Sequence, residues 1–332
     1  MKVGINGFGR IGRAVTRIAT LRDTCEITHI NTRKTSNEML AYLLRRDSVY
    51  RTFEKSVKAV PEGIEVDGRL ITTSQCASPA EIPWEKTGVE IVMDATGAFT
   101  KKEELMQHIR GSVKKVILTA PAKDHETTHV VLGVNDKDID FATVQVISNA
   151  SCTTNCAAPL FKVLEQEFGV NRGYLTTAHA YTQTQSLLDD AGKTEERSRA
   201  AALNIIPSTT GAAKAVGEVI PSLKGKMDGI AIRVPVPTGS FVDITAILKK
   251  ETTIEEINAA FKRYSEHEMK GILDVAEDII VSSDIIGSPF SSIFDPNYTN
   301  VIDGTFVKIF GWYDNEWGYS TRLVDLVEKF EV

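Results

Sequence analysis

The chain has 332 residues, of which 42% are hydrophobic and 25% charged, and its formal net charge is −6. This length allows two domains with separate cores, and no apolar run is long enough to span a bilayer. Positive and negative side chains are interspersed, so the charge pattern indicates neither a nucleic acid nor an anionic membrane as a partner.

The cysteines and the N-terminus indicate the compartment. Lys2 is followed directly by a strand pattern and a glycine-rich turn, which is unlike a secretion signal. The four cysteines match no structural zinc pattern, and a chain of this size needs no disulfide bonds: Cys25, Cys76, Cys152 and Cys156. We therefore expect a cytoplasmic protein without a metal site.

The first half alternates short β-rich runs with helical patterns, which predicts an α/β fold, a doubly wound parallel sheet. A helix opens near Arg10, and residues 57–73 indicate an antiparallel insertion around the Asp67-Gly68 turn. Strands are expected at residues 3–6, 26–30, 89–93, 115–118, 129–132 and 143–147.

The turn after the first strand reads Gly7-Phe8-Gly9-Arg10-Ile11-Gly12, which fits Gly-x-Gly-x-x-Gly. Between a strand and a helix, such glycines let a pyrophosphate approach the helix N-terminus, so we predict a dinucleotide site. A generic glycine-rich turn is the alternative. At the end of the second strand, NAD-binding proteins usually carry an acidic residue. This chain has Thr32-Arg33-Lys34, which either attract a 2′-phosphate or are solvated loop charges.

A strand then delivers Cys152 to the start of a helix, in the run Ser151-Cys152-Thr153-Thr154-Asn155. Unpaired N–H groups and the helix dipole favour a thiolate there, so we expect a lowered pKa for Cys152. The same N–H groups can stabilise an oxyanion formed when the sulfur attacks a carbonyl group. Cys156, one turn later, is expected to be a packed thiol.

The second half has longer, alternating strand patterns, which predict a mixed, mostly antiparallel sheet, and helices from Thr253 and over 318–330. His179 follows one of these strands and is either structural or the base that takes the thiol proton. Arg233 lies in an apolar strand, so it must pair with a carboxylate or await an anion. Arg197 and the small polar turn at Thr210-Gly211, which opens a helix, form a second potential anion site.

Together these motifs resemble the phosphorylating glyceraldehyde-3-phosphate dehydrogenases of the bacterial and eukaryotic type, from Lys2 to about Phe330. The most specific matches are Ala150 to Asn155, His179-Ala180-Tyr181-Thr182, Thr210 to Gly217, and Trp312 to Glu316. The resemblance implies a dinucleotide-binding domain at 1–149, a catalytic domain at 150–314, a C-terminal helix at 315–332 that returns to the first domain, and a homotetramer.

The resemblance also implies the mechanism and its residues. Cys152 would attack the aldehyde with His179 as the base, hydride would pass to a nicotinamide, and inorganic phosphate would attack the thioester. Thr182 and Arg233 would hold the substrate's phosphate, and the attacking phosphate would be held by Ser151, Thr153, Arg197, Thr210 and Gly211. The cofactor would contact Gly7, Gly9, Arg10, Ile11, Gly12, Thr32, Arg33, Lys34, Thr96, Thr119, Asn315 and Tyr319.

Departures from the family pattern concern the cofactor. NAD-using members carry Asp where this chain has Thr32, and a Leu-Pro pair where it has Asp190-Ala191. Asp190 opposes a 2′-phosphate and Arg33 favours one, so we predict use of both NADP and NAD, with a preference for NADP. Two other functions remain open: oxidation of erythrose 4-phosphate with water as the acyl acceptor, and a binding protein without catalysis.

Overall fold

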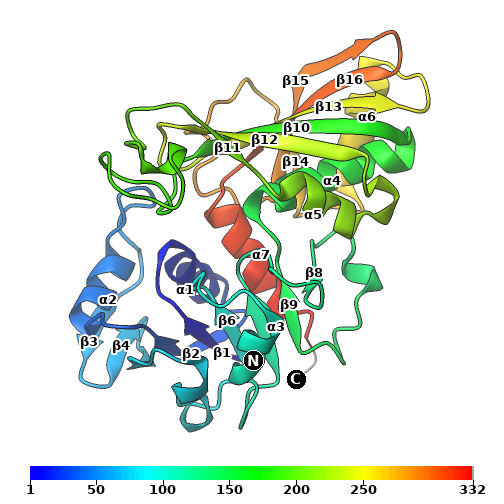
Figure 1. The fold of residues 1–332 in the computed structure, drawn as a ribbon. Coiled ribbons are helices and arrows are strands. Elements are labelled where there is room, and N and C mark those ends of the chain that lie inside the picture. Colours follow the sequence, from blue (N-terminus) through cyan, green and yellow to red (C-terminus); the bar gives the residue numbers. More distant parts are fainter. Residues whose placement is uncertain (331–332) are drawn as a thin grey trace. The chain divides into compact units, whose positions relative to one another are not determined.

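The computed structural model describes residues 1–330, which form two compact units (Figure 1). The first unit contains residues 1–130, residues 137–151 and residues 320–330. The second unit contains residues 131–136 and 152–319.

The first unit is built on a nine-stranded sheet in the order β3-β4-β5-β2-β1-β6-β7-β9-β8. All pairs are parallel except β3–β4 and β4–β5, which confirms the predicted parallel sheet and its antiparallel insertion. Its strands are β1 Lys2–Asn6, β2 Glu26–Asn31, β3 Val57–Val60, β4 Gly63–Val66, β5 Arg69–Ser74, β6 Ile91–Asp94, β7 Lys115–Leu118, β8 Thr128–His129 and β9 Val146–Ser148.

The helices of this unit are α1 Arg10–Arg22, α2 Asn37–Arg45 and α3 Lys102–Leu105. Apolar side chains at helical spacing, such as Val15 and Ile18, bury α1 against the sheet. Lys115, the first residue of β7, is buried. Its ammonium group donates to the carbonyl oxygens of Phe141, Ala142 and Val144, in the segment that leads to β9, at 2.7–2.9 Å.

One expected strand is mostly absent. Residues 129–132 were predicted to be a strand, but β8 ends at His129. Val130, Val131 and Leu132 are as buried as strand residues, yet the Val131 N–H bonds to the side chain of Asn135 in a turn. A short apolar run looks the same in a strand and in a buried loop, so the sequence pattern did not separate them.

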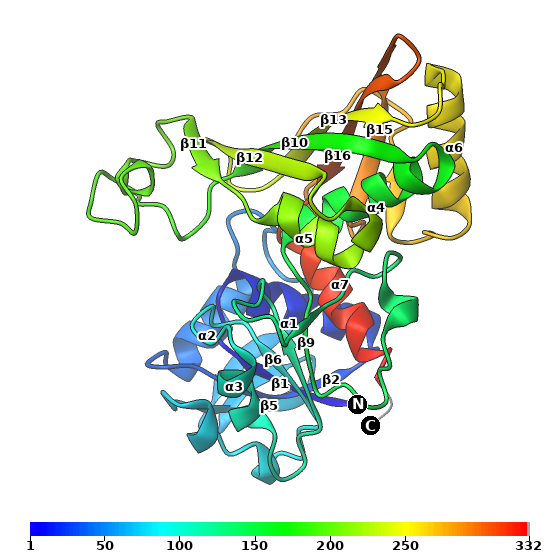
Figure 2. The same cartoon turned by 45° about the vertical axis from the view of Figure 1, so that its right-hand side comes forward.

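The second unit contains a seven-stranded sheet in the order β11-β12-β10-β13-β16-β15-β14 (Figure 2). Four of its six strand pairs are antiparallel, which confirms the predicted mixed sheet. Its strands are β10 Val170–Ala180, β11 Ile206–Thr209, β12 Met227–Val234, β13 Ser240–Leu248, β14 Leu273–Val275, β15 Ser292–Ile302 and β16 Phe306–Tyr313.

Helices cover one face of this sheet. They are α4 Cys152–Glu167, α5 Ala212–Val219 and α6 Ile254–Glu266, and α6 begins with the predicted Thr253–Glu256 capping box. In Figures 1 and 2, α4 and α5 lie on the same side of the sheet. The other face carries partly exposed apolar side chains: Tyr174, Ile230, Ile247 and Phe306. The last helix, α7 Trp317–Val327, continues from the second unit into the first.

Candidate active site

Cys152 is the first residue of α4, as expected from the sequence. The chain leaves β9 and turns through Ala150, whose φ of 51° is unusual for a residue with a Cβ atom. A backbone held in this way is typical of a position that must aim a particular side chain. Here the turn brings the thiol to the N-terminus of a 16-residue helix.

His179 meets this thiol from the end of β10. Its Nε2 atom lies 3.3 Å from the Cys152 Sγ atom, and its side chain is buried. The two residues are 27 positions apart in sequence, and the sheet and α4 bring them together. This distance allows direct proton transfer between the thiol and the imidazole ring.

Arg233 lies on the opposite side of the imidazole ring. β10 and β12 pair in parallel with His179 directly beside Arg233, so both side chains project from the same part of the sheet. An Nη atom of Arg233 is 2.7 Å from Nδ1 of His179 and 3.1 Å from the carbonyl oxygen of Ala180. That same oxygen lies 2.7 Å from Nδ1.

The pKa of the Cys152 thiol differs from the expectation drawn from the sequence. Burial raises the pKa of the Cys152 thiol, although the Arg233 charge and the Thr153 backbone N–H act in the opposite direction. The predicted lowering of this pKa is therefore wrong, because loss of solvent outweighs the helix start. Burial, assisted by the Arg233 charge, lowers the pKa of His179 to about 3. A neutral thiol therefore faces a neutral imidazole.

A buried hydroxyl network lies beside this pair, and the sequence analysis did not identify it. The Tyr313 hydroxyl is 2.9 Å from Thr153 Oγ1 and 3.0 Å from Thr177 Oγ1. Thr177 donates to the Phe241 carbonyl oxygen, so Tyr313 donates to Thr177 and accepts from Thr153. Tyr313 is 160 positions from Thr153, so no local sequence pattern could have connected them.

The candidate anion-binding residues gather around two arginines, Arg197 and Arg233, that form no ion pair with another residue in the described part of the chain. Arg197 donates to Ser208 at 3.3 Å and to Thr184 at 3.4 Å, and Thr184 Oγ1 lies 2.9 Å from Thr182 Oγ1. Arg233 has no carboxylate partner within residues 1–330, and its Nε atom is buried without a hydrogen bond. Burial lowers the pKa of Arg233 despite the opposing effects of Cys152 and Tyr313, and the nearby Arg197 charge also lowers it. Two close guanidinium groups favour an anion between them.

Thr210 and Gly211 lie at the start of α5, where Gly211 is the N-cap residue without a side-chain cap. The Thr210 hydroxyl accepts from the Ala212 N–H at 3.1 Å. Ser151 is partly buried and immediately precedes Cys152. These positions suit an anion because helix N-termini present N–H groups.

The glycine-rich turn has the shape that a pyrophosphate requires. Gly7 has a φ of 96°, and a Cβ atom there would lie 2.8 Å from the backbone of Thr96. A Cβ atom on Gly12 would lie 2.4 Å from the Gly7 carbonyl oxygen, whereas Gly9 faces open space. Gly9 is also the N-cap of α1 and offers no side-chain cap, so the first N–H groups of α1 remain open to an anion.

Arg10 and Ile11 begin that helix and are partly buried. Arg10 forms an ion pair with Asp47 and lies over the Tyr50 ring, with 5.4 Å between its guanidinium carbon and the ring centroid. Its side chain is thus held beside the turn by contacts within the first unit.

At the end of β2, Thr32 is buried and its Oγ1 atom has no hydrogen-bond partner among the described residues. Its N–H donates to the Ser74 carbonyl oxygen at 3.0 Å. Arg33 and Lys34 follow, both exposed, and neither forms an ion pair with another residue in the described part of the chain. An unpartnered hydroxyl and two exposed cations therefore lie together at the end of β2.

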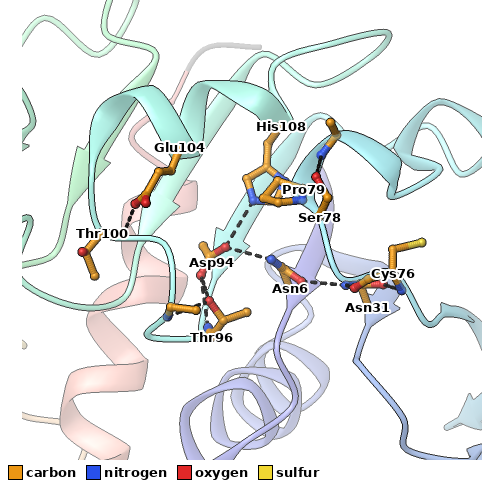
Figure 3. A network of polar contacts seen from close by, with 12 residues as sticks. Asn6, Asn31, Cys76, Ser78, Pro79, Asp94, Thr96, Thr100, Glu104 and His108 are labelled. Atoms are coloured by element: carbon orange, nitrogen blue, oxygen red, sulfur yellow. Dashed lines mark hydrogen bonds and ion pairs between the residues drawn. The ribbon is translucent and has the colours of Figure 1, made fainter.

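A buried polar network joins the ends of β1, β2 and β6 (Figure 3). Asp94 accepts from Asn6 Nδ2 at 2.8 Å and from the N–H and hydroxyl of Thr96 at 3.1 and 2.6 Å. His108 Nε2 lies 3.2 Å from the same carboxylate. Asn6 also accepts from Asn31 Nδ2 at 2.8 Å, which extends the network toward Thr32.

This network fixes which ring nitrogen of His108 carries the proton, and it fixes the position of the turn at Thr96. The indole N–H of Trp84 donates to His108 Nδ1 at 3.1 Å, so His108 carries its proton on Nε2 and donates it to Asp94. Thr96 is thereby held at the carboxyl end of β6, and the Thr119 N–H bonds to the Asp94 carbonyl oxygen at 3.0 Å. Ligands of open α/β sheets bind at this edge of the strands.

The remaining two candidates belong to the second unit. Asn315 is buried, and its Oδ1 atom accepts from Ser240 at 2.9 Å and from Thr238 at 3.3 Å. Tyr319 lies in α7 and is 5% exposed.

Within residues 1–330, no three His, Cys, Asp or Glu side chains are grouped so that they could hold a metal ion. No helix in the same range has the length and apolar character required to cross a membrane.

Two family models match the chain. The C-terminal domain of glyceraldehyde 3-phosphate dehydrogenase matches residues 151–315, and its NAD binding domain matches residues 1–102. A glyceraldehyde-3-phosphate dehydrogenase of Streptomyces coelicolor is 52% identical over 328 residues, 98% of this chain and 97% of the relative. The enzyme of the same name numbered 1 in Bacillus subtilis is 49% identical over 326 residues, with the same coverage.

These matches explain why a nicotinamide-dinucleotide turn and a cysteine–histidine pair occur in one chain. They cover both units, and they include the cysteine, the histidine and both arginines of the site. The chain therefore belongs to the family of phosphorylating, nicotinamide-dependent glyceraldehyde-3-phosphate dehydrogenases.

Proposed function

We propose that Cys152 is the nucleophile and His179 the base in the oxidation of glyceraldehyde 3-phosphate. The observation that carries this assignment is the 3.3 Å separation of Cys152 Sγ and His179 Nε2. As the thiol gives its proton to Nε2, its sulfur bonds to the aldehyde carbon, and the imidazolium returns the proton to the resulting oxyanion, which completes the hemithioacetal. The N–H groups at the start of α4 are suited to stabilise the oxyanion.

His179 then removes the hydroxyl proton of the hemithioacetal as a hydride leaves the same carbon, and a thioester remains. The bound nicotinamide supplies the acceptor for that hydride. Inorganic phosphate attacks the thioester, the carbon–sulfur bond breaks, and an acyl phosphate is released. Thr182 and Arg233 hold the substrate's phosphate, and the attacking phosphate is held by Ser151, Thr153, Arg197, Thr210 and Gly211.

Replacing Cys152 by Ser tests this assignment. Cys152→Ser should abolish aldehyde-dependent formation of reduced nicotinamide, because an alcohol at this position is a far weaker nucleophile. Dinucleotide affinity, measured by calorimetry, should stay within about twofold of the unmodified protein, since no proposed contact to the dinucleotide is removed. Turnover by the variant would contradict the covalent route.

Two other functions are separated by simple assays. An enzyme that oxidises erythrose 4-phosphate with water as the acyl acceptor needs no inorganic phosphate, whereas this site should stop after one turnover without it. A protein that only binds would give no reduced nicotinamide with any aldehyde. The unpaired Arg197 and Arg233 side chains support the phosphate-dependent reaction.

For the cofactor we propose use of both NADP and NAD, with a preference for NADP. The orphaned Thr32 hydroxyl and the exposed Arg33 and Lys34 support it, because all three tolerate or attract a 2′-phosphate. Asp190 is exposed and would repel that group. The ratio of kcat/KM for the two cofactors measures the balance, and a strong preference for NAD would reject it. The other proposed contacts to the dinucleotide are Gly7, Gly9, Arg10, Ile11, Gly12, Thr96, Thr119, Asn315 and Tyr319.

We further propose a dinucleotide-binding domain at 1–149, a catalytic domain at 150–314, a C-terminal helix at 315–332 that returns to the first domain, and a cytoplasmic homotetramer. Family membership supports all four, and the apolar sheet face around Tyr174, Ile247 and Phe306 supports the assembly because monomers rarely leave such faces uncovered. Sedimentation velocity should give four times the chain mass, and Ile247→Lys should reduce it.

A further inference from the structure

A tight turn after β10 brings two threonine hydroxyls together. The Gln185 N–H donates to the Thr182 carbonyl oxygen at 3.0 Å, which closes a four-residue turn. The buried Gln185 side chain reinforces the turn, because its Oε1 atom accepts from the Thr182 N–H at 3.3 Å. Inside this turn Thr184 folds back, so that its Oγ1 atom lies 2.9 Å from Thr182 Oγ1.

Arg197 reaches the same Thr184 hydroxyl from a later part of the chain. One Nη atom of Arg197 donates to Thr184 Oγ1 at 3.4 Å, and the other donates to Ser208 Oγ on β11 at 3.3 Å. The Ser186 N–H donates to the Arg197 carbonyl oxygen at 3.1 Å, which holds the two segments side by side. Thr184 therefore contacts one residue of each proposed phosphate site: Thr182 of the substrate's phosphate and Arg197 of the attacking phosphate.

A bound phosphate would give these hydrogen bonds a single direction. A guanidinium group can only donate and a phosphate dianion can only accept, whereas each hydroxyl has one proton to donate. When Thr182 donates its proton to the substrate's phosphate, its oxygen must accept from Thr184, and the Thr184 oxygen accepts from Arg197. The three bonds then run from the cation to the anion, and bonds in such a chain polarise and strengthen one another.

The bridge at position 184 is also neutral. A hydroxyl accepts from Arg197 without cancelling its charge, and Arg197 forms no ion pair with another residue within residues 1–330. The positive charge of Arg197 is therefore available both to an anion and to the chain of hydroxyls that leads to Thr182.

We propose that Thr184 is a positioning residue, which orients the Thr182 hydroxyl as a donor to the phosphate of the substrate. Thr184 acts through Thr182 and Arg197, without contact to the aldehyde group. It thereby favours aldehydes that carry a phosphate over aldehydes that carry none. This inference rests on the proposed role of Thr182 in holding the substrate's phosphate.

Thr184→Val tests the proposal, because valine has the shape of threonine without the hydroxyl. The KM for glyceraldehyde 3-phosphate should rise about three- to tenfold, with kcat within about twofold; the effect is moderate because Thr184 is exposed and water competes for its bonds. The KM for inorganic phosphate should rise by at most about twofold, since Arg197 keeps its charge and its bond to Ser208. Thr184→Ser keeps the hydroxyl and should retain the KM values of the unmodified protein.

Glyceraldehyde without a phosphate separates orientation from general damage. This substrate offers no acceptor to Thr182, so its kcat/KM in Thr184→Val should stay within about twofold of the unmodified protein. The matched control is Thr194→Val, since Thr194 is an exposed threonine of the same segment whose hydroxyl bonds to Glu196. Its KM for glyceraldehyde 3-phosphate should not change.

Three results would overturn the proposal: an unchanged KM for glyceraldehyde 3-phosphate in Thr184→Val, an equal loss with both aldehydes, or a Thr184→Ser variant no better than Thr184→Val. Each of them leaves the proposed function intact, provided that the unmodified protein oxidises glyceraldehyde 3-phosphate. If the unmodified protein forms no reduced nicotinamide with this aldehyde, the proposed function itself fails.

Discussion

Replacing Asp94 by Asn should weaken cofactor binding without touching any reacting group. The Asp94 carboxylate is fully buried and accepts four hydrogen bonds, from Asn6, His108 and the N–H and hydroxyl of Thr96. An amide of the same size keeps one acceptor atom and introduces an NH₂ group. The network is shown in Figure 3.

Neither orientation of the new amide satisfies its neighbours. An NH₂ group toward His108 meets Nε2–H, whose proton is fixed because Trp84 occupies Nδ1. An NH₂ group toward Thr96 meets the backbone N–H, although the hydroxyl can rotate to accept. At least one buried donor therefore loses its partner, at a cost of about 1–3 kcal/mol, and the other bonds lose their charge assistance. We expect a total loss of about 2–4 kcal/mol in stability.

Because the disturbed bonds hold the Thr96 turn, part of this cost should appear in dinucleotide binding. A cost of about 1.4 kcal/mol there raises Kd and KM about tenfold. We expect that rise for the dinucleotide in steady-state kinetics and calorimetry, with kcat within about twofold. The control is Asp228→Asn, since Asp228 is exposed and its carboxylate accepts a hydrogen bond from the neighbouring Gly229 N–H. Unchanged cofactor KM in Asp94→Asn with a lowered melting temperature would refute the link between the network and the site.

Three further changes have defined outcomes. Thr32→Asp should shift the ratio of kcat/KM values for the two cofactors toward NAD by about tenfold or more, because a carboxylate can accept from the ribose hydroxyl and repels a 2′-phosphate. An unchanged ratio would show that Thr32 does not select between NAD and NADP. Burial lowers the pKa of His29 to about 4, so the unfolded chain binds a proton at this imidazole more readily than the folded chain does. The free energy of unfolding should therefore fall by up to about 3 kcal/mol as the pH is lowered from about 6.5 to about 4. His29→Gln should reduce this pH dependence, measured by urea titrations at each pH. Lys115→Met should lower stability by about 2–4 kcal/mol, because three carbonyl groups at residues 141–144 lose their charged donor; denaturation of Lys114→Met is the comparison, and equal losses would reject the reasoning.

Local patterns predicted the elements that depend on local chemistry. The turn Gly7 to Gly12 was recognised because its conformation needs glycine, and the α6 capping box because Thr253 and Glu256 bond to each other's backbone. β11, β14 and β15 were not predicted, because edge and mixed strands depend on the neighbours that they pair with.

The sequence by itself determined the reactive groups: a cysteine at a helix start, a glycine-rich turn, and an arginine in an apolar strand. Only the tertiary structure decided their protonation and partners. Burial raises the pKa of Cys152 where the helix start alone predicted a fall, and strand pairing places Arg233 against His179. Solvent exclusion and contacts between distant strands are properties of the packed chain, so no local pattern contains them.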